Sequence, residues 1–163
     1  MNSFTYSDFE LCRMQGKIFE NSRFYKDSSP VFIRRFMYSD IARRMDEGGY
    51  MFESTGDMLL HEDAASENSN PRKVCFSREE LYWIGYIYRY WAIMTGAASK
   101  KIFKIAPSRE MRELYYPYHS LSPEQAIERI LESKGISNED EISKGVRILR
   151  RIKKEKGMLE LVN

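Results

Sequence analysis

The side chains of this chain that could transfer protons are two pairs of glutamates and one histidine that follows an arginine. Glu79 with Glu80, and Glu110 with Glu113, could each supply a general acid and a general base. Both pairs fall in the first turn of an expected helix, where the helix dipole stabilises a carboxylate. We therefore interpret both pairs as structural.

Arg112 and His119 have six residues between them in the segment RELYYPYHS. Their spacing resembles the Arg-x(4–6)-His signature of the HEPN ribonucleases, in which both residues act on a helix at a composite dimer site. Pro117 lies between them and is expected to break the helix, which would remove their fixed geometry. We therefore expect His119 to be a structural hydrogen-bonding residue in a turn, and keep a HEPN-like ribonuclease as the less favoured alternative.

The sequence contains no metal box, nucleotide-binding loop or nucleophile motif. Cys12 and Cys75 fit no metal-ligand spacing and are too few for a disulfide framework, so we expect two reduced core thiols in a cytoplasmic protein. His61 has no companion at metal-ligand spacing. The first residues, MNSFTYSDFEL, carry no export signal. We predict no metal, no cofactor and no enzymatic activity.

The composition is that of a soluble globular protein, with 42% hydrophobic and 31% charged residues among 163. The net charge of +2 is unevenly distributed. Residues 46–70 contain seven acids and no Lys or Arg, whereas residues 137–157 contain seven bases and four acids. The sequence therefore predicts an electrically polarised molecule.

The segment LYWIGYIYRYWAIM, residues 81–94, places aromatic and aliphatic side chains on every side of an expected helix. A surface helix normally keeps one polar face, but here Arg89 is the only charged residue. These 14 residues are too few to span a bilayer, so we predict no membrane insertion. The helix is expected to lie at the centre of the domain.

One face of this aromatic helix is expected to be core. It holds Ile84, Ile87, Tyr88 and Trp91. The opposite face contains Gly85, where we expect a neighbour to approach the backbone closely, and residues of the types that dominate binding hot spots. The candidate partner-binding residues are Tyr82, Tyr86, Arg89, Tyr115, Tyr118 and His119. The alternative is that the whole helix is covered within its own domain.

Capping residues and apolar periodicity predict an all-α fold. We expect helices over about 5–21, 29–48, 78–96, 99–106, 108–116, 123–134 and 138–156. Residues 53–72 are expected to form an acidic, mobile loop. Together these elements predict a single compact domain, residues 1–163, of six to seven short helices around the central aromatic helix.

The last expected helix, KGVRILRRIKKEK, is basic and amphipathic. Its polar side carries Arg147, Arg150, Arg151 and Lys154, and Lys100, Lys101 and Lys104 form a second basic cluster. Clustered bases favour phosphate contacts, although the sequence pI of about 8.4 is below the strongly basic range. A solvated helix face, an acidic protein partner and nucleic acid all remain open.

Three segments, WIGYIYRYW, SKKIFK and LYYPYHSLSPEQAIERILE, resemble a family of small bacterial proteins encoded beside toxin-like genes, including ADP-ribosyltransferase-like ones. The resemblance covers residues 77–134, with a weaker match in FIRRFMYSDIARRMD. It implies an antitoxin or immunity role, in which the protein binds and neutralises a cognate protein. It supplies no catalytic residues.

The favoured hypothesis is a cytoplasmic, non-enzymatic module that binds and restrains a partner protein, such as a toxin enzyme. In one variant, the acidic segment blocks a nuclease by masking its basic groove. The alternative from another class is a nucleic-acid-binding protein that uses the C-terminal basic helix. The sequence leaves the oligomeric state open.

Overall fold

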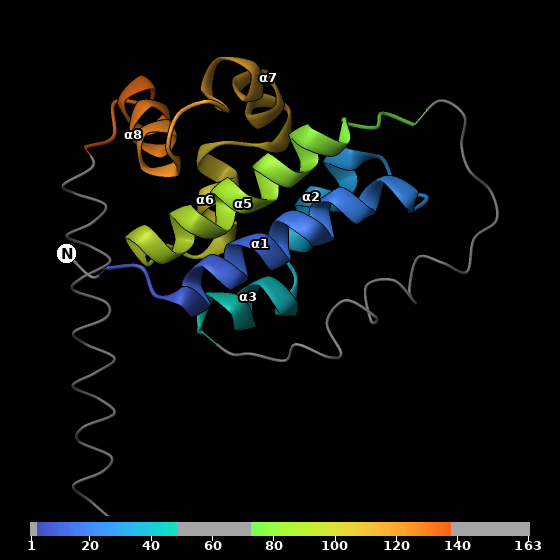
Figure 1. The fold of residues 1–163 in the computed structure, drawn as a ribbon. Coiled ribbons are helices and arrows are strands. Elements are labelled where there is room, and N and C mark those ends of the chain that lie inside the picture. The colour runs from blue at the N-terminus through green and yellow to red at the C-terminus, as the bar shows by residue number, and fades with distance from the viewer. Residues whose placement is uncertain (1–2, 49–72, 138–163) are drawn as a thin grey trace, which may run out of the picture.

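The computed structural model describes residues 3–48 and 73–137, and these are all helical or irregular. The described helices are α1 (Tyr6–Asn21), the 3-10 helix η1 (Ser22–Phe24), α2 (Ser29–Met37), α3 (Asp40–Asp46), α5 (Arg78–Thr95), α6 (Ser99–Ile105), α7 (Ser108–Tyr118) and α8 (Pro123–Ser133) (Figure 1). The prediction of an all-α fold is confirmed. The predicted loop at 53–72 and the predicted helix at 138–156 lie outside the described residues.

Local capping sequences set the beginnings and ends of these helices. Thr5, Ser77 and Ser122 each form a capping box with the side chain three residues on, as the sequence predicts for Ser77. Gly96 ends α5 with φ +69° and Gly135 follows α8 with φ +66°. Glycine adopts this left-handed conformation without a steric penalty, so both helices end where expected.

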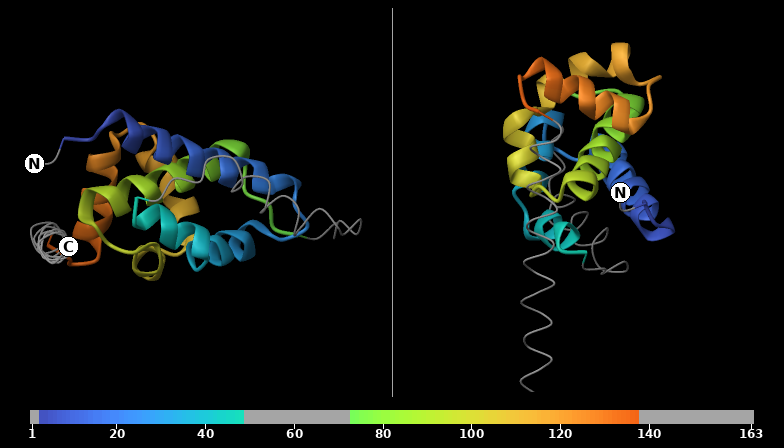
Figure 2. Two further views of the ribbon diagram at one scale, coloured as in Figure 1. Left: turned by 90° about the horizontal axis from the view of Figure 1, so that it is seen from below. Right: turned by 90° about the vertical axis from the view of Figure 1, so that its left-hand side faces the viewer.

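Helices α1 and α5 lie side by side and antiparallel, with α5 at the centre of the fold and α1 at its edge (Figures 1 and 2). The two helices approach closely at Gly85, where an added Cβ would lie 2.7 Å from the carbonyl oxygen of Gln15. An added Cβ at Gly16 would lie 2.9 Å from the Tyr82 ring. The expectation that a neighbour approaches the backbone at Gly85 is confirmed, and that neighbour is α1.

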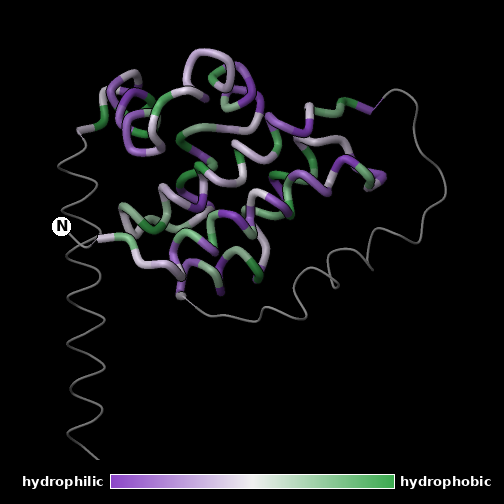
Figure 3. The backbone as a smooth tube through the Cα atoms, in the orientation of Figure 1, coloured by the Kyte–Doolittle hydropathy of each residue, from purple (hydrophilic) through white to green (hydrophobic). Residues whose placement is uncertain are grey.

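The remaining described helices lie around α5 and leave the outer side of α1 uncovered (Figure 2). In the view of Figure 1, α7 and α8 lie above α5, while α2, α3 and α6 lie behind the pair and below it. Hydrophobic and hydrophilic residues are interleaved along each described helix (Figure 3). The expected core face of α5 is buried, because Ile84, Tyr88 and Trp91 have no exposed surface and Ile87 has almost none. No helix in 3–48 or 73–137 has the length and apolar character needed to cross a membrane.

The expected single helix over residues 29–48 is wrong, because the structure divides it into α2 and α3. Ser39 explains the break. Its hydroxyl donates to the carbonyl of Phe36 at 2.6 Å and accepts from the amide of Ala42 at 3.2 Å. One side chain therefore ends α2 and caps α3, and serine competes with helix continuation in this way.

The expectation that Pro117 stops its helix at Tyr116 is also wrong, since α7 continues to Tyr118. Proline removes one backbone donor, but here it lies in the last turn. The amide of His119 still donates to the carbonyl of Tyr115 at 2.8 Å. The final turn therefore survives the loss of one hydrogen bond.

The two cysteines occupy different environments, and both are free thiols. Cys12 is fully buried, as expected for a core thiol, and burial raises its pKa to about 12. The expectation of burial is wrong for Cys75, which is exposed on the segment that leads into α5. Only Cys12 therefore belongs to the core.

Candidate binding groove

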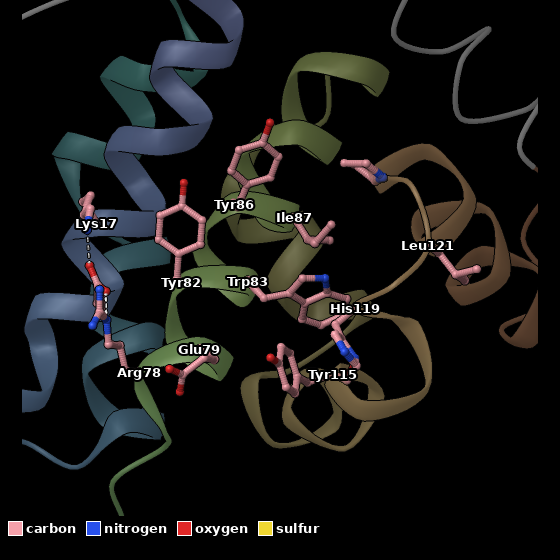
Figure 4. Close-up of a pocket in the computed structure, with 12 residues that line it drawn as sticks. Lys17, Arg78, Glu79, Tyr82, Trp83, Tyr86, Ile87, Tyr115, His119 and Leu121 are labelled. Atoms are coloured by element: carbon pink, nitrogen blue, oxygen red, sulfur yellow. Dashed lines mark hydrogen bonds and ion pairs between the residues drawn. The ribbon is translucent and has the colours of Figure 1, made fainter.

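A groove with a volume of about 810 Å³ opens beside α5, between α1 and α7 (Figure 4). Its ring-bearing residues are Tyr82, Trp83, Tyr86, Tyr115 and His119, and we call it the aromatic groove. Ile87, Leu121 and Pro123 complete its apolar surface. Four of the six partner-binding candidates, the three tyrosines and the histidine, therefore line one depression.

One side of the groove is formed by Tyr82 and Tyr86, which lie one turn apart on α5. Their ring centroids are 6.1 Å apart, and Tyr86 stacks in turn against Tyr90 at 6.3 Å. Both hydroxyls point away from the helix in the same direction (Figure 4). Burial raises the pKa of Tyr86, so its hydroxyl stays protonated and can donate a hydrogen bond.

The other side joins α5 to α7 through ring contacts. Trp83 meets Tyr115 edge to face, with centroids 5.8 Å apart, and Tyr115 stacks on His119 at 4.8 Å (Figure 4). Aromatic pairs at these separations stabilise each other beyond their buried area. The three rings therefore hold one another in place while remaining partly exposed.

His119 is fixed by the end of its own helix. Its Nδ1 lies 3.0 Å from the carbonyl oxygen of Tyr115 and 2.9 Å from that of Tyr116. Both partners are acceptors, so Nδ1 must carry the proton. In the neutral form of the ring with the proton on Nδ1, Nε2 is an acceptor. The structural role expected for His119 is observed, at the edge of the aromatic groove.

Charged side chains line the groove beside α1. Lys17 Nζ lies 2.7 Å from a carboxylate oxygen of Glu20, and Arg78 Nε donates to the other oxygen. The hydrogen bonds from Lys17 and Arg78 hold the pKa of Glu20 below its ordinary value. Glu79 is exposed and forms no ion pair with any residue in 3–48 or 73–137. It interacts with Arg78 through space only, so its carboxylate oxygens are free of a direct ion pair within the described residues while the groove as a whole carries two acids and two bases.

The prediction that Arg89 binds a partner is wrong, because its side chain has no exposed surface. Its Nη1 lies 2.7 Å from Asp46 Oδ1, its Nε donates to Gln15 Oε1 at 2.8 Å, and its Nη2 donates to Ser99 Oγ at 3.1 Å. Burial lowers the pKa of Arg89, and Asp46 opposes this effect. Arg89 therefore joins α1, α3, α5 and α6 inside the protein.

Tyr118 also lies outside the groove. It is half-buried and packs against the hydrophobic core. The sequence does not show that Tyr115 lines the groove and Tyr118 does not, because both residues lie shortly before His119. Only Tyr115, one helical turn before His119, is positioned to stack on the imidazole.

The structure does not bring the side chains of Arg112 and His119 together as a catalytic pair. Arg112 Nε donates to Glu80 at 3.2 Å, and its guanidinium lies 4.7 Å from the centre of the Phe76 ring. Arg112 lines a separate pocket of about 370 Å³, whereas His119 lines the aromatic groove. The geometry gives these two side chains different partners.

One glutamate of each pair has a structural contact that fits the interpretation from the sequence. Glu80 accepts from the amide of Ser77 at 2.8 Å, and Glu110 forms an ion pair with Lys134 at 2.7 Å. Within the part of the chain that the structure describes, no three His, Cys, Asp or Glu side chains form a group that could hold a metal ion. The alternative nucleic-acid residues Arg147, Arg150, Arg151 and Lys154 lie outside the described residues.

Trp83, Glu79 and Lys17 line the groove, but the sequence does not mark them as partner-binding residues. Trp83 falls between the core and partner faces of a helical wheel, so only the position of α7 shows which surface it lines. Lys17 belongs to α1, and no local pattern links it to α5. The groove is a product of packing between helices.

No protein-family model, curated protein or solved structure matches this chain. The resemblance of residues 77–134 to the antitoxin-like family therefore rests on those residues alone.

Proposed function

We propose that this protein is a non-enzymatic binding module whose aromatic groove receives a segment of a partner protein. The observation that carries this proposal is the convergence of five ring-bearing side chains, all partly exposed, on one groove. Tyr and Trp combine a large contact area with a polar group and are enriched in binding hot spots. A ring-lined groove left open to solvent fits this use.

The polar groups of the groove specify the partner further. Glu79 offers a carboxylate that forms no direct ion pair within the described residues, and the Tyr82 ring already attracts a cation, since Lys17 Nζ lies 5.9 Å from its centre. We infer that the bound segment has an apolar part that covers Trp83 and Ile87 and a Lys or Arg that reaches Glu79. The Nε2 of His119 can accept one hydrogen bond from that segment.

The partner that we propose is a toxin enzyme restrained by binding, in a bacterial cytoplasm. The resemblance of residues 77–134 to antitoxin-like proteins supports this class of partner, and the groove supports a protein ligand. A HEPN-like ribonuclease has less support, because Arg112 is engaged with Glu80 and Phe76.

Site-specific photo-crosslinking tests the proposal in cells of the source organism. A photoreactive phenylalanine analogue at Tyr86 is expected to capture one protein, identified by mass spectrometry. The matched control carries the same analogue at Tyr116, which is 83% exposed and does not line the groove. If position 116 captured the same protein as efficiently as position 86, the groove would not be the contact site.

A further inference from the structure

A second surface, formed by α2 and α6, gathers positive charge around one exposed tyrosine. We call it the cationic patch and define it by Arg34, Tyr38, Lys100 and Lys104. It shares no residue with the aromatic groove. The start of α6 is held beside the end of α3, because the amide of Ser99 donates to Asp46 Oδ2 at 2.9 Å.

Tyr38 brings cations of two helices together. The Arg34 guanidinium lies 6.0 Å from the centre of the Tyr38 ring and the Lys100 ammonium 5.4 Å from it. Phe103 of α6 meets the same ring edge to face at 5.9 Å. Lys104 lies one turn after Lys100, so it extends the same face of α6.

The charge of this patch is not neutralised by the described residues. Arg34, Lys100 and Lys104 form no ion pair within 3–48 and 73–137. The nearby acids are engaged elsewhere: Asp27 pairs with Arg35, Asp40 with Arg43, and Asp46 with Arg89. Three exposed cations therefore share one surface without described counter-charges.

We propose that the cationic patch binds the phosphate backbone of nucleic acid, independently of the proposed protein ligand of the aromatic groove. Two of its three cations are lysines, which are depleted in protein–protein interfaces, whereas nucleic-acid interfaces are strongly positive. Flexible ammonium and guanidinium groups spaced along a helix suit successive phosphates without reading base sequence.

Binding of a fluorescent, mixed-sequence single-stranded RNA tests this proposal. Anisotropy titrations of the full chain from about 50 to 200 mM salt give the slope of log affinity against log salt. The triple variant Arg34→Ala, Lys100→Ala, Lys104→Ala is expected to flatten this slope by about 2, because each lost contact to a single strand removes about 0.7. All three residues are exposed, and circular dichroism checks that the variant folds.

A matched control removes the same charge elsewhere, through Arg13→Ala, Arg109→Ala and Arg129→Ala. These exposed residues lie on α1, α7 and α8, and their loss should leave the slope within about 0.5 of the wild type. Equal flattening by both variants would overturn the proposal, because net charge alone would explain it.

Two further outcomes would also overturn the proposal. One is loss of RNA binding only when Arg150 and Arg151 are replaced by Ala, with no effect of the patch variant. The other is tighter binding of polyglutamate than of RNA at equal charge and salt, which would assign the patch to an acidic protein. The proposal would be supported if the slope of log affinity against log salt changed only when the patch residues were replaced.

Discussion

Arg89 on α5 and Asp46 at the end of α3 form an ion pair with 2.7 Å between Nη1 and Oδ1, although 43 residues separate them in the sequence. The arginine side chain is completely covered, and that of Asp46 is 16% exposed. A buried cation requires its counter-ion, so this contact ties the orientation of α3 to that of α5.

Replacing Asp46 by Asn should lower the free energy of unfolding by about 3 kcal/mol, because it leaves a buried charge without its counter-ion. Urea denaturation measures the change. The matched control is Asp40→Asn, which breaks an exposed pair with Arg43 and should change the denaturation midpoint far less, because solvent screens the pair. Equal denaturation midpoints for the two variants would show that Arg89 does not depend on Asp46.

Replacing Gly85 by Ala should lower the free energy of unfolding by about 1 to 3 kcal/mol, even though alanine is the better helix former. The new Cβ would meet the backbone oxygen of Gln15, which cannot move without α1. Gly16→Ala is the comparison, since its Cβ meets the edge of the Tyr82 ring first and should cost less. Thermal melts rank the two, and a Gly85→Ala protein as stable as the wild type would refute the close packing.

Glu20 should make stability depend on pH in the acid range. Its folded pKa is depressed by Lys17 and Arg78, so its contribution is present above the ordinary glutamate pKa of about 4.3 and is lost as pH falls through the folded pKa. The Glu20→Gln variant should be destabilised by less than about 1 kcal/mol at pH 7, since both bases are largely exposed. Denaturation at pH 7 and pH 3 measures this difference, which should shrink towards zero at pH 3; a constant difference would contradict the linkage.

The two cysteines should differ sharply in reactivity. Iodoacetamide should alkylate exposed Cys75 in the native protein, whereas Cys12 is buried and its pKa is raised to about 12. Intact-mass spectrometry over time should therefore show one adduct under native conditions and two in denaturant. Modification of Cys12 before Cys75 would place the thiols in the opposite environments.

The fold could be predicted from the sequence as far as it depends on local chemistry. Ser77, Gly96 and Ser122 mark helix ends by contacts within a few residues, and those ends agree with the expectation. The break at Ser39 is just as local, but the apolar spacing on both sides of it continues the helical pattern. The apolar periodicity therefore predicts one continuous helix, although Ser39 ends α2 and caps α3.

The candidate site was less predictable because it depends on packing. Arg89 resembles a hot-spot residue by type, and nothing near it in the sequence indicates that Asp46 neutralises it. Tyr82 and Tyr86 are partly exposed and line the groove, and their role in partner binding stays a prediction. Trp83 and Lys17 join them only because α7 and α1 lie on either side of α5.

The affinity of the purified chain for the protein crosslinked at position 86, measured by isothermal titration calorimetry, tests the groove most directly. Tyr86→Ala should weaken binding about 30-fold, equivalent to about 2 kcal/mol, as loss of an aromatic hot spot does. Tyr116→Ala should leave the dissociation constant unchanged, and thermal melts should show both variants folded. An unchanged dissociation constant for Tyr86→Ala would contradict the proposal that the aromatic groove holds the partner.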